Sequence, residues 1–400
     1  MAPIPTADRR FRRDLYLLSA TFVFVFMGAG AQQAYLVPYL SRVTDWSKLQ
    51  CSSIVACVYG GMVVFRLLNL RLFPHWSDRR YTLVGAWAYF AFTVLMATVA
   101  FVPSYPLAAA GAVLWGAGAA MMWTGTSMQI LRLSDQAGGR HGTGMGILYT
   151  SLHAGWLAGA ILLGLLYDHL ESRSLYLVYV AAAAITLPGN LLAFLLPASD
   201  TPARCTVTLA GIGDVLRRPR AQIAAALQFF SALGYGLILG AFTRYVETEY
   251  GASWIWVTVS LYPATLMALS WVGGALNDRY GPSPVLVSGF VAGAAGLAVT
   301  VCFHSPYSAV LTAFALGLLN STVSVSASAI VGKEAEPERR PLVYGVVFAA
   351  RDLGIVSAAL GATALGNAIP MPTVFGLFAI VFAACAGLSM ALGRYARQSL

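Results

Sequence analysis

Charged side chains are scarce in this sequence. Asp, Glu, Lys and Arg make up 10% of its 400 residues, whereas apolar residues make up 58%. Because a soluble globular protein carries about 25% charged residues, this composition excludes that class. We therefore expect a membrane protein.

The signatures of several enzyme classes are also missing. No phosphate-binding loop with Gly-Lys followed by Ser or Thr occurs, so the sequence gives no support for direct ATP hydrolysis by this chain. The five cysteines form no Cys-x-x-Cys pair and have no His neighbours at metal-ligand spacing. No nucleophile–base pair is visible. We therefore expect no enzyme activity, no metal site and no cofactor.

Long apolar runs are abundant instead. Each run of roughly 20 residues suffices to cross a hydrocarbon core about 30 Å thick, and such continuous runs predict helices rather than the alternating strands of a barrel. Twelve spans are predicted at 15–40, 50–70, 81–101, 106–131, 144–166, 174–196, 221–246, 255–276, 284–303, 306–331, 342–364 and 371–393. The predicted fold class is an all-α membrane protein with twelve transmembrane helices.

One long polar segment interrupts the series of spans. Residues 197–220 are rich in Pro, Thr and Arg and separate two sets of six spans. The predicted organisation is an N-terminal six-helix bundle at 1–196, a cytoplasmic linker at 197–220 and a C-terminal six-helix bundle at 221–400.

Lys and Arg are distributed unequally between the two sides of the membrane. With the N-terminus inside, only four lie in outer segments: Arg42, Lys48, Arg173 and Arg244. The cytoplasmic segments hold nineteen: Arg9, Arg10, Arg12, Arg13, Arg71, Arg79, Arg80, Arg132, Arg140, Arg204, Arg217, Arg218, Arg220, Arg279, Lys333, Arg339, Arg340, Arg394 and Arg397. Because positive loops stay in the cytoplasm, both termini are predicted inside. This distribution accounts for the net charge of +9 without a nucleic-acid partner.

The two halves repeat each other. Asp78-Arg79, after the second span, and Asp278-Arg279, after the eighth, lie 200 residues apart. Two further sets match in the same order: Gly28, Gly30 and Tyr39 with Gly234, Gly236 and Tyr245 at a displacement of 206, and Arg140, Gly146 and Gly155 with Arg339, Gly345 and Gly354 at a displacement of 199. These matches predict a duplicated six-helix unit with its pseudo-twofold axis along the membrane normal.

The second Asp-Arg copy carries a family resemblance. Gly274-Ala-Leu-Asn-Asp278-Arg279-Tyr-Gly281 resembles the loop motif G-x-x-x-D-R-x-G of the major facilitator superfamily of secondary transporters. The first copy keeps only Asp78 and Arg79. The resemblance covers nearly the whole chain and implies two pseudo-symmetric six-helix bundles, with this motif holding the outward-facing state closed at the cytoplasmic side. A solvated, positive loop is the simpler alternative for either copy.

The fifth span partly resembles the antiporter motif of that family. Four glycines match its spacing: Gly146, Gly155, Gly159 and Gly164. Ala160 stands where the motif has proline, and in the fourth span Ala112 stands where proton-linked members have arginine. Small residues at helical spacing also permit close helix packing, so packing is an equally good interpretation of these glycines.

Two adjacent charges lie deep in the eleventh span. Arg351 and Asp352 are nine and ten residues into it, about 14 Å along a helix rising about 1.5 Å per residue. Each costs roughly 2.5–3.5 kcal/mol near the midplane, and neighbours on a helix point about 100° apart, so their partners must come from elsewhere. They are predicted to handle substrate or protons in a central cavity, with a structural ion pair between helices as the alternative.

The repeat relates His153 to Asp352, because the two are displaced by 199. If the family fold holds, both face one cavity, and both residue types are suited to exchanging protons near neutral pH. Arg351 aligns with Leu152, so it belongs to one half only. Its guanidinium suits recognition of an anionic group.

The first span contributes further candidates. Gln32, Gln33 and Tyr35 are interpreted as substrate contacts, because first helices of each half line the cavity in this family. Their counterparts in the seventh span are Ile238, Leu239 and Ala241, which predicts a cavity polar toward the first half and apolar toward the second. Arg66, near the cytoplasmic end of the second span, is expected to extend its charge toward the membrane surface.

These features favour a secondary transporter working by alternating access in a bacterial inner membrane. Export of a small organic molecule driven by a proton gradient is the favoured function. Uptake or facilitated passage of an organic anion bound by Arg351 is one alternative, and a transporter-like scaffold or assembly factor that moves nothing is another. The expected partners are the substrate and the lipid bilayer, and the expected oligomeric state is a monomer.

Overall fold

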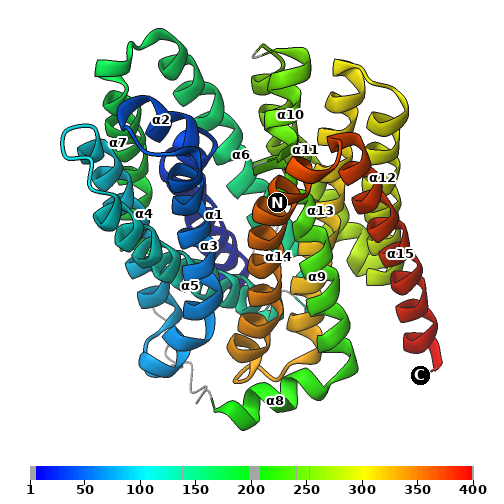
Figure 1. Cartoon of the computed structure of the whole chain (residues 1–400). Coiled ribbons are helices and arrows are strands. Elements are labelled where there is room, and N and C mark those ends of the chain that lie inside the picture. The colour runs from blue at the N-terminus through cyan, green and yellow to red at the C-terminus, as the bar shows by residue number, and fades with distance from the viewer. Residues whose placement is uncertain (1–5, 137, 198–207, 240, 252, 399–400) are drawn as a thin grey trace, which may run out of the picture.

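Helices make up almost all of the described chain (Figure 1). The computed structural model describes residues 6–136, 138–197, 208–239, 241–251 and 253–398. The first half contains α1 (Thr6–Val25), η1 (Phe26–Gly30), η2 (Ala31–Tyr35), α2 (Leu36–Val43), α3 (Lys48–Leu72), α4 (Asp78–Val99), α5 (Tyr105–Gln136), α6 (His141–His169), η3 (Ser172–Ser174) and α7 (Tyr176–Ala193). The rest contains α8 (Leu209–Arg217), α9 (Pro219–Leu239), α10 (Ala241–Tyr250), α11 (Ser253–Tyr280), α12 (Pro282–Cys302), α13 (Pro306–Glu334), α14 (Arg340–Ala368) and α15 (Met371–Gln398).

The predicted fold class is confirmed. Within the described residues, eleven helical segments are long and apolar enough to cross a membrane. The remaining predicted span is α11, a helix of 28 residues that packs along α6. The first predicted span consists of α1, η1, η2 and α2, and the seventh consists of α9 and α10. Twelve spans therefore result from these elements.

Several helix starts follow from local sequence. Ser47 and Gln50 form a capping box at α3, and Ser305 and Ser308 form one at α13. Gly281 adopts a φ of +81° immediately before Pro282, where α12 begins. Such caps satisfy backbone donors that a helix end leaves without partners. These residues therefore fix where the three helices begin.

The two halves lie side by side, with α1–α7 to the left and α9–α15 to the right in Figure 1. The contacts across their interface are equivalent. Helix α6 of the first half packs along α11 of the second, and α14 of the second half packs along α3 of the first. The glycine repeat reflects this symmetry. A methyl group on Gly155 would meet the carbonyl oxygen of Val23 on α1, and one on Gly354 would meet that of Phe229 on α9. The repeat found in the sequence thus corresponds to equivalent helix crossings.

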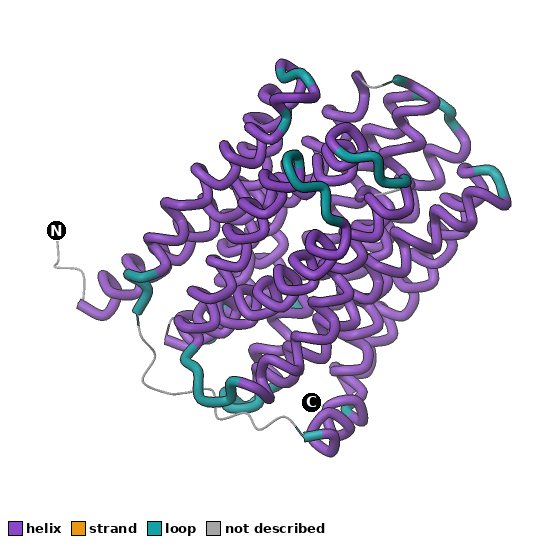
Figure 2. The backbone as a smooth tube through the Cα atoms, turned by 60° about the vertical axis from the view of Figure 1, so that its left-hand side comes forward, coloured by secondary structure: helices purple, strands orange, loops and turns teal. Residues whose placement is uncertain are grey.

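In Figure 2 the long helices run obliquely from upper right to lower left. The described chain begins at the left and ends at the bottom, both at the lower ends of these helices. We call this the termini end. It also holds the connections α3–α4, α5–α6, α11–α12 and α13–α14. Which side of a membrane it faces stays a prediction from the Lys and Arg distribution, as do the domain boundaries.

The predicted linker contains a helix that hydropathy did not indicate. Thr208 caps α8 by accepting a hydrogen bond from the Gly211 N–H, at 3.0 Å. The helix packs against α9 and α14 and buries Val215. Residues 198–207 of the linker lie outside the described residues. The described part of the linker is therefore attached to the second half.

Candidate functional site

The first span changes its helical geometry halfway along. Phe26–Gly30 form a π-helical turn and Ala31–Tyr35 a 3₁₀ segment, where a regular span would continue as an α-helix. Such irregular turns are frequent at functional sites. Phe26, Gly30 and Gln33 from this part of the span line a cavity between the two halves.

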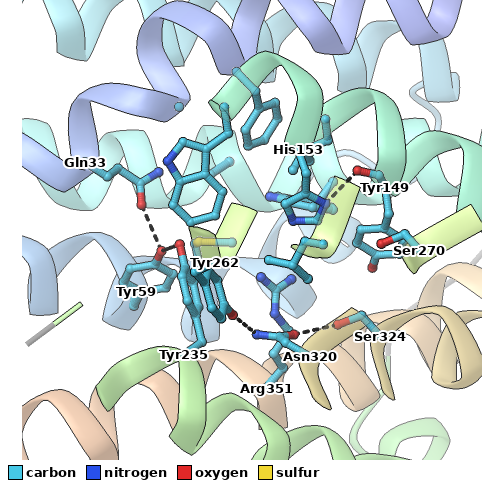
Figure 3. Close-up of a pocket in the computed structure, with 18 of the residues that line it drawn as sticks. Gln33, Tyr59, Tyr149, His153, Tyr235, Tyr262, Ser270, Asn320, Ser324 and Arg351 are labelled. Atoms are coloured by element: carbon cyan, nitrogen blue, oxygen red, sulfur yellow. Dashed lines mark hydrogen bonds between the residues drawn. The ribbon is translucent and has the colours of Figure 1, made fainter. Parts of the chain in front are cut away.

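The cavity is built from helices of both halves. Figure 3 shows its polar residues converging from opposite sides. The first half contributes Phe26, Gly30, Gln33, Val58, Tyr59, Met62, Tyr89, Trp115, Ala119, Trp123, Tyr149, Leu152, His153 and Trp156. The second half contributes Tyr235, Tyr262, Leu266, Ser270, Asn320, Ser321, Ser324 and Arg351.

Arg351 points into this cavity (Figure 3). The residue is 9% exposed, and its Nε and Nη1 atoms have no hydrogen-bond partner within the described residues. Its guanidinium carbon lies 5.2 Å from the centre of the Trp123 ring, a cation–π contact. A ring face does not replace hydrogen-bond acceptors, so the charge remains available to a ligand.

Asp352 faces away from the cavity that its neighbour lines. Its carboxylate accepts hydrogen bonds from Nε and Nη2 of Arg66 on α3, the second at 3.3 Å. Asp352 is 0% exposed and Arg66 is 1% exposed. The prediction that Asp352 faces the cavity is therefore wrong, because the helix directs adjacent side chains to different sides. The pair joins α3 of the first half to α14 of the second.

The interpretation of Arg66 as an arginine that reaches the membrane surface is also wrong. Besides Asp352, its guanidinium lies over the rings of Tyr344 and Phe348, at 5.9 and 5.7 Å. Arg66 is thus enclosed by charge and aromatic faces from α14. Sequence reasoning missed this pairing because the partner lies 286 residues away.

His153 lies on the cavity wall, at the position that the repeat relates to Asp352. Its Nδ1 is 2.6 Å from the Tyr149 carbonyl oxygen. A carbonyl oxygen only accepts, so Nδ1–H donates this bond. In a neutral ring, Nε2 is then the nitrogen that can accept a proton. The ring also lies nearly parallel to Tyr149, with the centroids 6.1 Å apart. His153 and Arg351 therefore share one cavity, whereas His153 and Asp352 do not.

Of the three candidates in the first span, only Gln33 lines the cavity. Its Oε1 accepts a hydrogen bond from the Tyr59 hydroxyl at 2.9 Å. Gln32 is turned toward α4, where Nε2 donates to Thr93 at 2.8 Å. Tyr35 donates to the Ala160 carbonyl oxygen at 2.5 Å and stacks on Tyr167. The structure thus places the Gln32 and Tyr35 side chains in packing interfaces rather than on the cavity wall, and their role as substrate contacts stays a prediction.

The polarity of the cavity is the reverse of the prediction. The second half supplies Asn320, Ser321 and Ser324 from α13 in addition to Arg351, whereas the first half supplies mostly aromatic and aliphatic side chains. The prediction compared only the first and seventh spans, whereas α11 and α13 contribute Ser270, Asn320, Ser321 and Ser324 to the polar wall. Small polar residues within apolar runs, such as the serines of α13, were the available signal.

The complete Asp-Arg motif connects the two halves at the termini end. Asp278 accepts hydrogen bonds from the backbone N–H groups of Gly142 and Thr143 at 3.1 and 2.7 Å, and from the Thr143 hydroxyl at 2.8 Å. These donors form the start of α6, where a carboxylate also interacts favourably with the helix dipole. A methyl group on Gly274 would collide with the Gly142 carbonyl. Asp278 and Gly274 thus both keep α11 close to α6.

The other residues of this motif have local roles. Gly281 provides the positive φ before α12, a conformation that favours glycine. Arg279 is exposed, and its guanidinium lies 5.1 Å from the centre of the Tyr280 ring. Gly281 therefore shapes the turn into α12, while the contact between the halves comes from Asp278.

The incomplete first copy acts within its own half. Asp78 pairs with Arg132 on α5, and Arg79 donates to the Phe194 carbonyl oxygen at the end of α7. The repeat assigns Pro341 and Leu342 to the positions of Gly142 and Thr143. Pro341 has no N–H, so α14 cannot receive a carboxylate in the way that α6 does.

A further ion pair joins the halves at this end. Asp135 on α5 accepts hydrogen bonds from Nη1 and Nη2 of Arg340 on α14, at 2.5 and 3.1 Å, and lies 2.8 Å from Nε2 of His141. Sequence reasoning missed it, although the repeat places Arg340 opposite His141 at a displacement of 199. Together with the Asp278 and Asp352 contacts, this pair joins the two halves. By contrast, α2 packs mainly on α3, and α10 mainly on α9 and α11, so each stays within its own half.

The four glycines of the fifth span lie at helix contacts. A methyl group would meet the Ser270 carbonyl from Gly146, the Val23 carbonyl from Gly155, the Met27 carbonyl from Gly159 and the Tyr35 hydroxyl from Gly164. These glycines therefore allow α6 to approach the first span and α11, which is the packing interpretation. Their role in antiport stays a prediction.

Comparisons with known proteins agree with this architecture. At the level of the fold, the chain resembles FucP, a major facilitator transporter in the outward conformation, with a TM-score of 0.71 and 17% identity over 94% of this chain and 97% of that one. It also resembles the human organic anion transporter MFSD10, with a TM-score of 0.73 and 12% identity over 96% and 100% of the two chains.

Curated relatives match a shorter stretch. Multidrug resistance protein MdtH of Cronobacter sakazakii is 28% identical over 147 residues, which cover 36% of each chain. MdtH of Citrobacter koseri is 29% identical over 118 residues, or 29% of each chain. The alignments thus span about a third of these relatives' length. The family model for the Major Facilitator Superfamily matches residues 17–227 and 224–398, so this chain belongs to the Major Facilitator Superfamily.

Proposed function

We propose that this chain is a secondary active transporter that exports a small organic solute from the cytoplasm of a bacterium by alternating access. The observation that carries the proposal is the cavity between the two halves, which is lined by the Arg351 guanidinium, whose Nε and Nη1 find no hydrogen-bond partner in the described part of the chain. Family membership supports transport, and the likeness to multidrug resistance proteins supports export.

Alternating access requires the contacts at the termini end to break and form again. Three polar contacts cross between the halves there: Asp278 with the start of α6, Asp135 with Arg340, and Asp352 with Arg66. Their rupture would let the halves separate at that end, which is the cytoplasmic end under the predicted orientation. The irregular helix at Phe26–Tyr35 offers a place for the first span to bend.

Asp352 is the proposed site of proton coupling. A proton arriving from outside and binding a carboxylate oxygen would neutralise Asp352 and leave Arg66 without its counter-charge. The contact between α3 and α14 would weaken, and the cytoplasmic end could then open. Release of the proton inside would restore the ion pair and close that end again. Protons would thus move inward while solute moves outward, and His153 is the second candidate for proton exchange.

Uptake or facilitated passage of an organic anion is the second candidate function. The same Arg351 guanidinium favours it, because a buried cation without a partner suits an anionic ligand. The two functions differ in direction and in proton coupling, which a vesicle experiment separates.

The test uses inverted membrane vesicles that contain the full chain, an imposed proton gradient and a pH-sensitive dye. Addition of transported solutes should collapse the gradient with the unchanged protein and with Asp352→Glu, but not with Asp352→Asn. Asp45→Asn, an exposed carboxylate between α2 and α3, is the matched control. Solute movement without proton movement would favour the facilitator, and no movement across a broad panel of solutes would favour the scaffold.

A further inference from the structure

The charges around the cavity do not balance. Arg66 and Asp352 neutralise each other in a buried pair. Arg351 is the one described lining residue with a permanent charge. A single buried positive charge is best matched by a single negative charge, because burying an unpaired ion is costly. A dianion would leave one charge uncompensated, and a cation would add repulsion.

Most of the cavity's polar atoms that lack a hydrogen-bond partner within the described residues are N–H donors, and the other is the Tyr149 hydroxyl, which can donate or accept. Arg351 Nε and Nη1 and the indole nitrogens of Trp115 and Trp156 have no hydrogen-bond partner in the described part of the chain. Guanidinium and indole N–H groups only donate. Because buried donors are normally paired, these four atoms call for a ligand that carries several acceptors. A carboxylate or sulfonate provides them together with the negative charge.

Several amide and hydroxyl groups that could serve as acceptors are already engaged with one another, whereas the Tyr149 hydroxyl has no hydrogen-bond partner within the described residues. Asn320 donates to the Tyr262 hydroxyl at 2.5 Å and accepts from Ser324 at 3.0 Å. Tyr59 donates to Gln33 at 2.9 Å (Figure 3). These bonds hold the polar side chains in place and leave little for a ligand that mainly donates hydrogen bonds. The cavity therefore favours ligands that carry hydrogen-bond acceptors over ligands that mainly donate hydrogen bonds.

The walls of the cavity are flat and aromatic. Tyr235 and Tyr262 stack with an interplanar angle of 4° and centroids 5.6 Å apart. Trp156 contacts both edge-on, at 5.8 and 6.2 Å. Trp123 lies beside the Arg351 guanidinium. Aromatic surfaces of this kind favour a planar ring, and each pair contributes about 0.5–1.5 kcal/mol beyond buried area.

We propose that the cavity binds a planar aromatic monoanion, with its carboxylate or sulfonate against Arg351 and its ring against the aromatic group of Trp123, Trp156, Tyr235 and Tyr262. This assignment rests on the proposed transport function and names the substrate class of the same site. The class differs from amphiphilic cations, which the aromatic walls alone would also accept. The guanidinium decides between the two.

Binding to the purified full chain in lipid nanodiscs tests the assignment. The probes share one ring system: naphthalene-2-carboxylate, its neutral amide, naphthalene-2,6-dicarboxylate and a naphthyl trimethylammonium cation. Because three tryptophans line the cavity, their fluorescence reports occupancy, and calorimetry checks the affinities. The monocarboxylate should bind most tightly. A tighter cation, or equal affinities for amide and carboxylate, would overturn the proposal.

Three variants locate the anion. Arg351→Gln should weaken carboxylate binding about tenfold to a hundredfold, as expected for a charge-assisted hydrogen-bonding contact, while amide binding changes little. Arg351→Lys should keep the preference for the monoanion. Arg173→Gln, an exposed arginine beyond α6, is the matched control and should change nothing.

A merely structural role for Arg351 makes the opposite prediction. Because Arg351 lacks hydrogen-bond partners, its removal should leave the thermal unfolding midpoint unchanged or raise it. If Arg351→Gln does not fold, Arg351→Lys decides, and loss of the monoanion preference in that variant overturns the proposal. Transport of other solutes without naphthalene-2-carboxylate binding would refute this inference alone. Binding without transport would instead refute the proposed function.

Discussion

The buried pair of Arg66 and Asp352 makes a quantitative prediction about stability. Both side chains are fully buried, at 0% side-chain exposure. Replacing one partner leaves the other charge buried without compensation, which typically costs about 3–5 kcal/mol. Arg66→Met and Asp352→Leu should therefore each lower the free energy of unfolding by roughly that amount. Either loss is a large fraction of the about 5–15 kcal/mol typical of folded proteins.

The double variant should behave very differently. Arg66 Nη1 has no partner within the described residues, so the pair recovers only part of the energy needed to remove two charges from water. Replacing both residues with apolar ones of similar size is expected to be close to neutral or stabilising by about 1–4 kcal/mol. The two single effects should thus fail to add by several kcal/mol.

Urea unfolding in detergent micelles, followed by tryptophan fluorescence, measures the four free energies of this cycle. The exposed pair of Arg339 and Glu336, with 3.8 Å between its charged atoms, is the control and should contribute about 0–1 kcal/mol. Single variants that cost less than about 1 kcal/mol would refute the reasoning, since the charges would then not be desolvated. A double variant as unstable as the sum of the singles would refute the coupling.

Two further predictions concern helix contacts. Gly159→Ala places a methyl group against the Met27 carbonyl and should destabilise the chain by about 1–3 kcal/mol in the same assay. Gly60→Ala is the control, because a methyl group there meets nothing within 4 Å. Equal effects of the two variants would contradict the packing role. Asp278→Asn should loosen the contact of α11 with α6, so spin labels at Gln136 and Glu338 should show a larger fraction of long distances. Asp78→Asn should leave that distribution unchanged, because Asp78 pairs within its own half, and similar changes in both variants would contradict the assignment.

Hydropathy and the repeat were sufficient to predict the fold. The twelve spans follow from the length of apolar segments that a bilayer requires, and membrane helices cannot leave backbone groups unpaired. The packing of α3 and α6 against helices of the other half could not be predicted from the spans alone. The motif at Asp278 nevertheless indicated where one of these contacts lies. The helix α8 escaped notice because a short interfacial helix has no continuous apolar run.

The sequence predicted how deep the site residues lie in the membrane, but not which way their side chains face. The position of Arg351 and Asp352 within a span implies buried charges, yet only the rotation of α14 decides that Arg351 lines the cavity and Asp352 meets Arg66. The same limit applies to Gln32, which lies beside Gln33 in sequence and faces α4. The aromatic walls gave no signal at all, because Trp and Tyr in apolar runs are equally suited to ordinary packing.

The inequality of the two motif copies has a simple chemical origin. The backbone of α6 offers Asp278 two N–H groups, whereas Pro341 removes one of the equivalent donors from α14. Asp78 is satisfied by Arg132 within its half, and α14 is held instead by the Arg340 side chain on Asp135. One interface at the termini end thus depends on a carboxylate and a helix start, and the other on an ion pair between two side chains. The two interfaces need not separate at the same energy, so opening can begin at one of them while the other still holds the halves together.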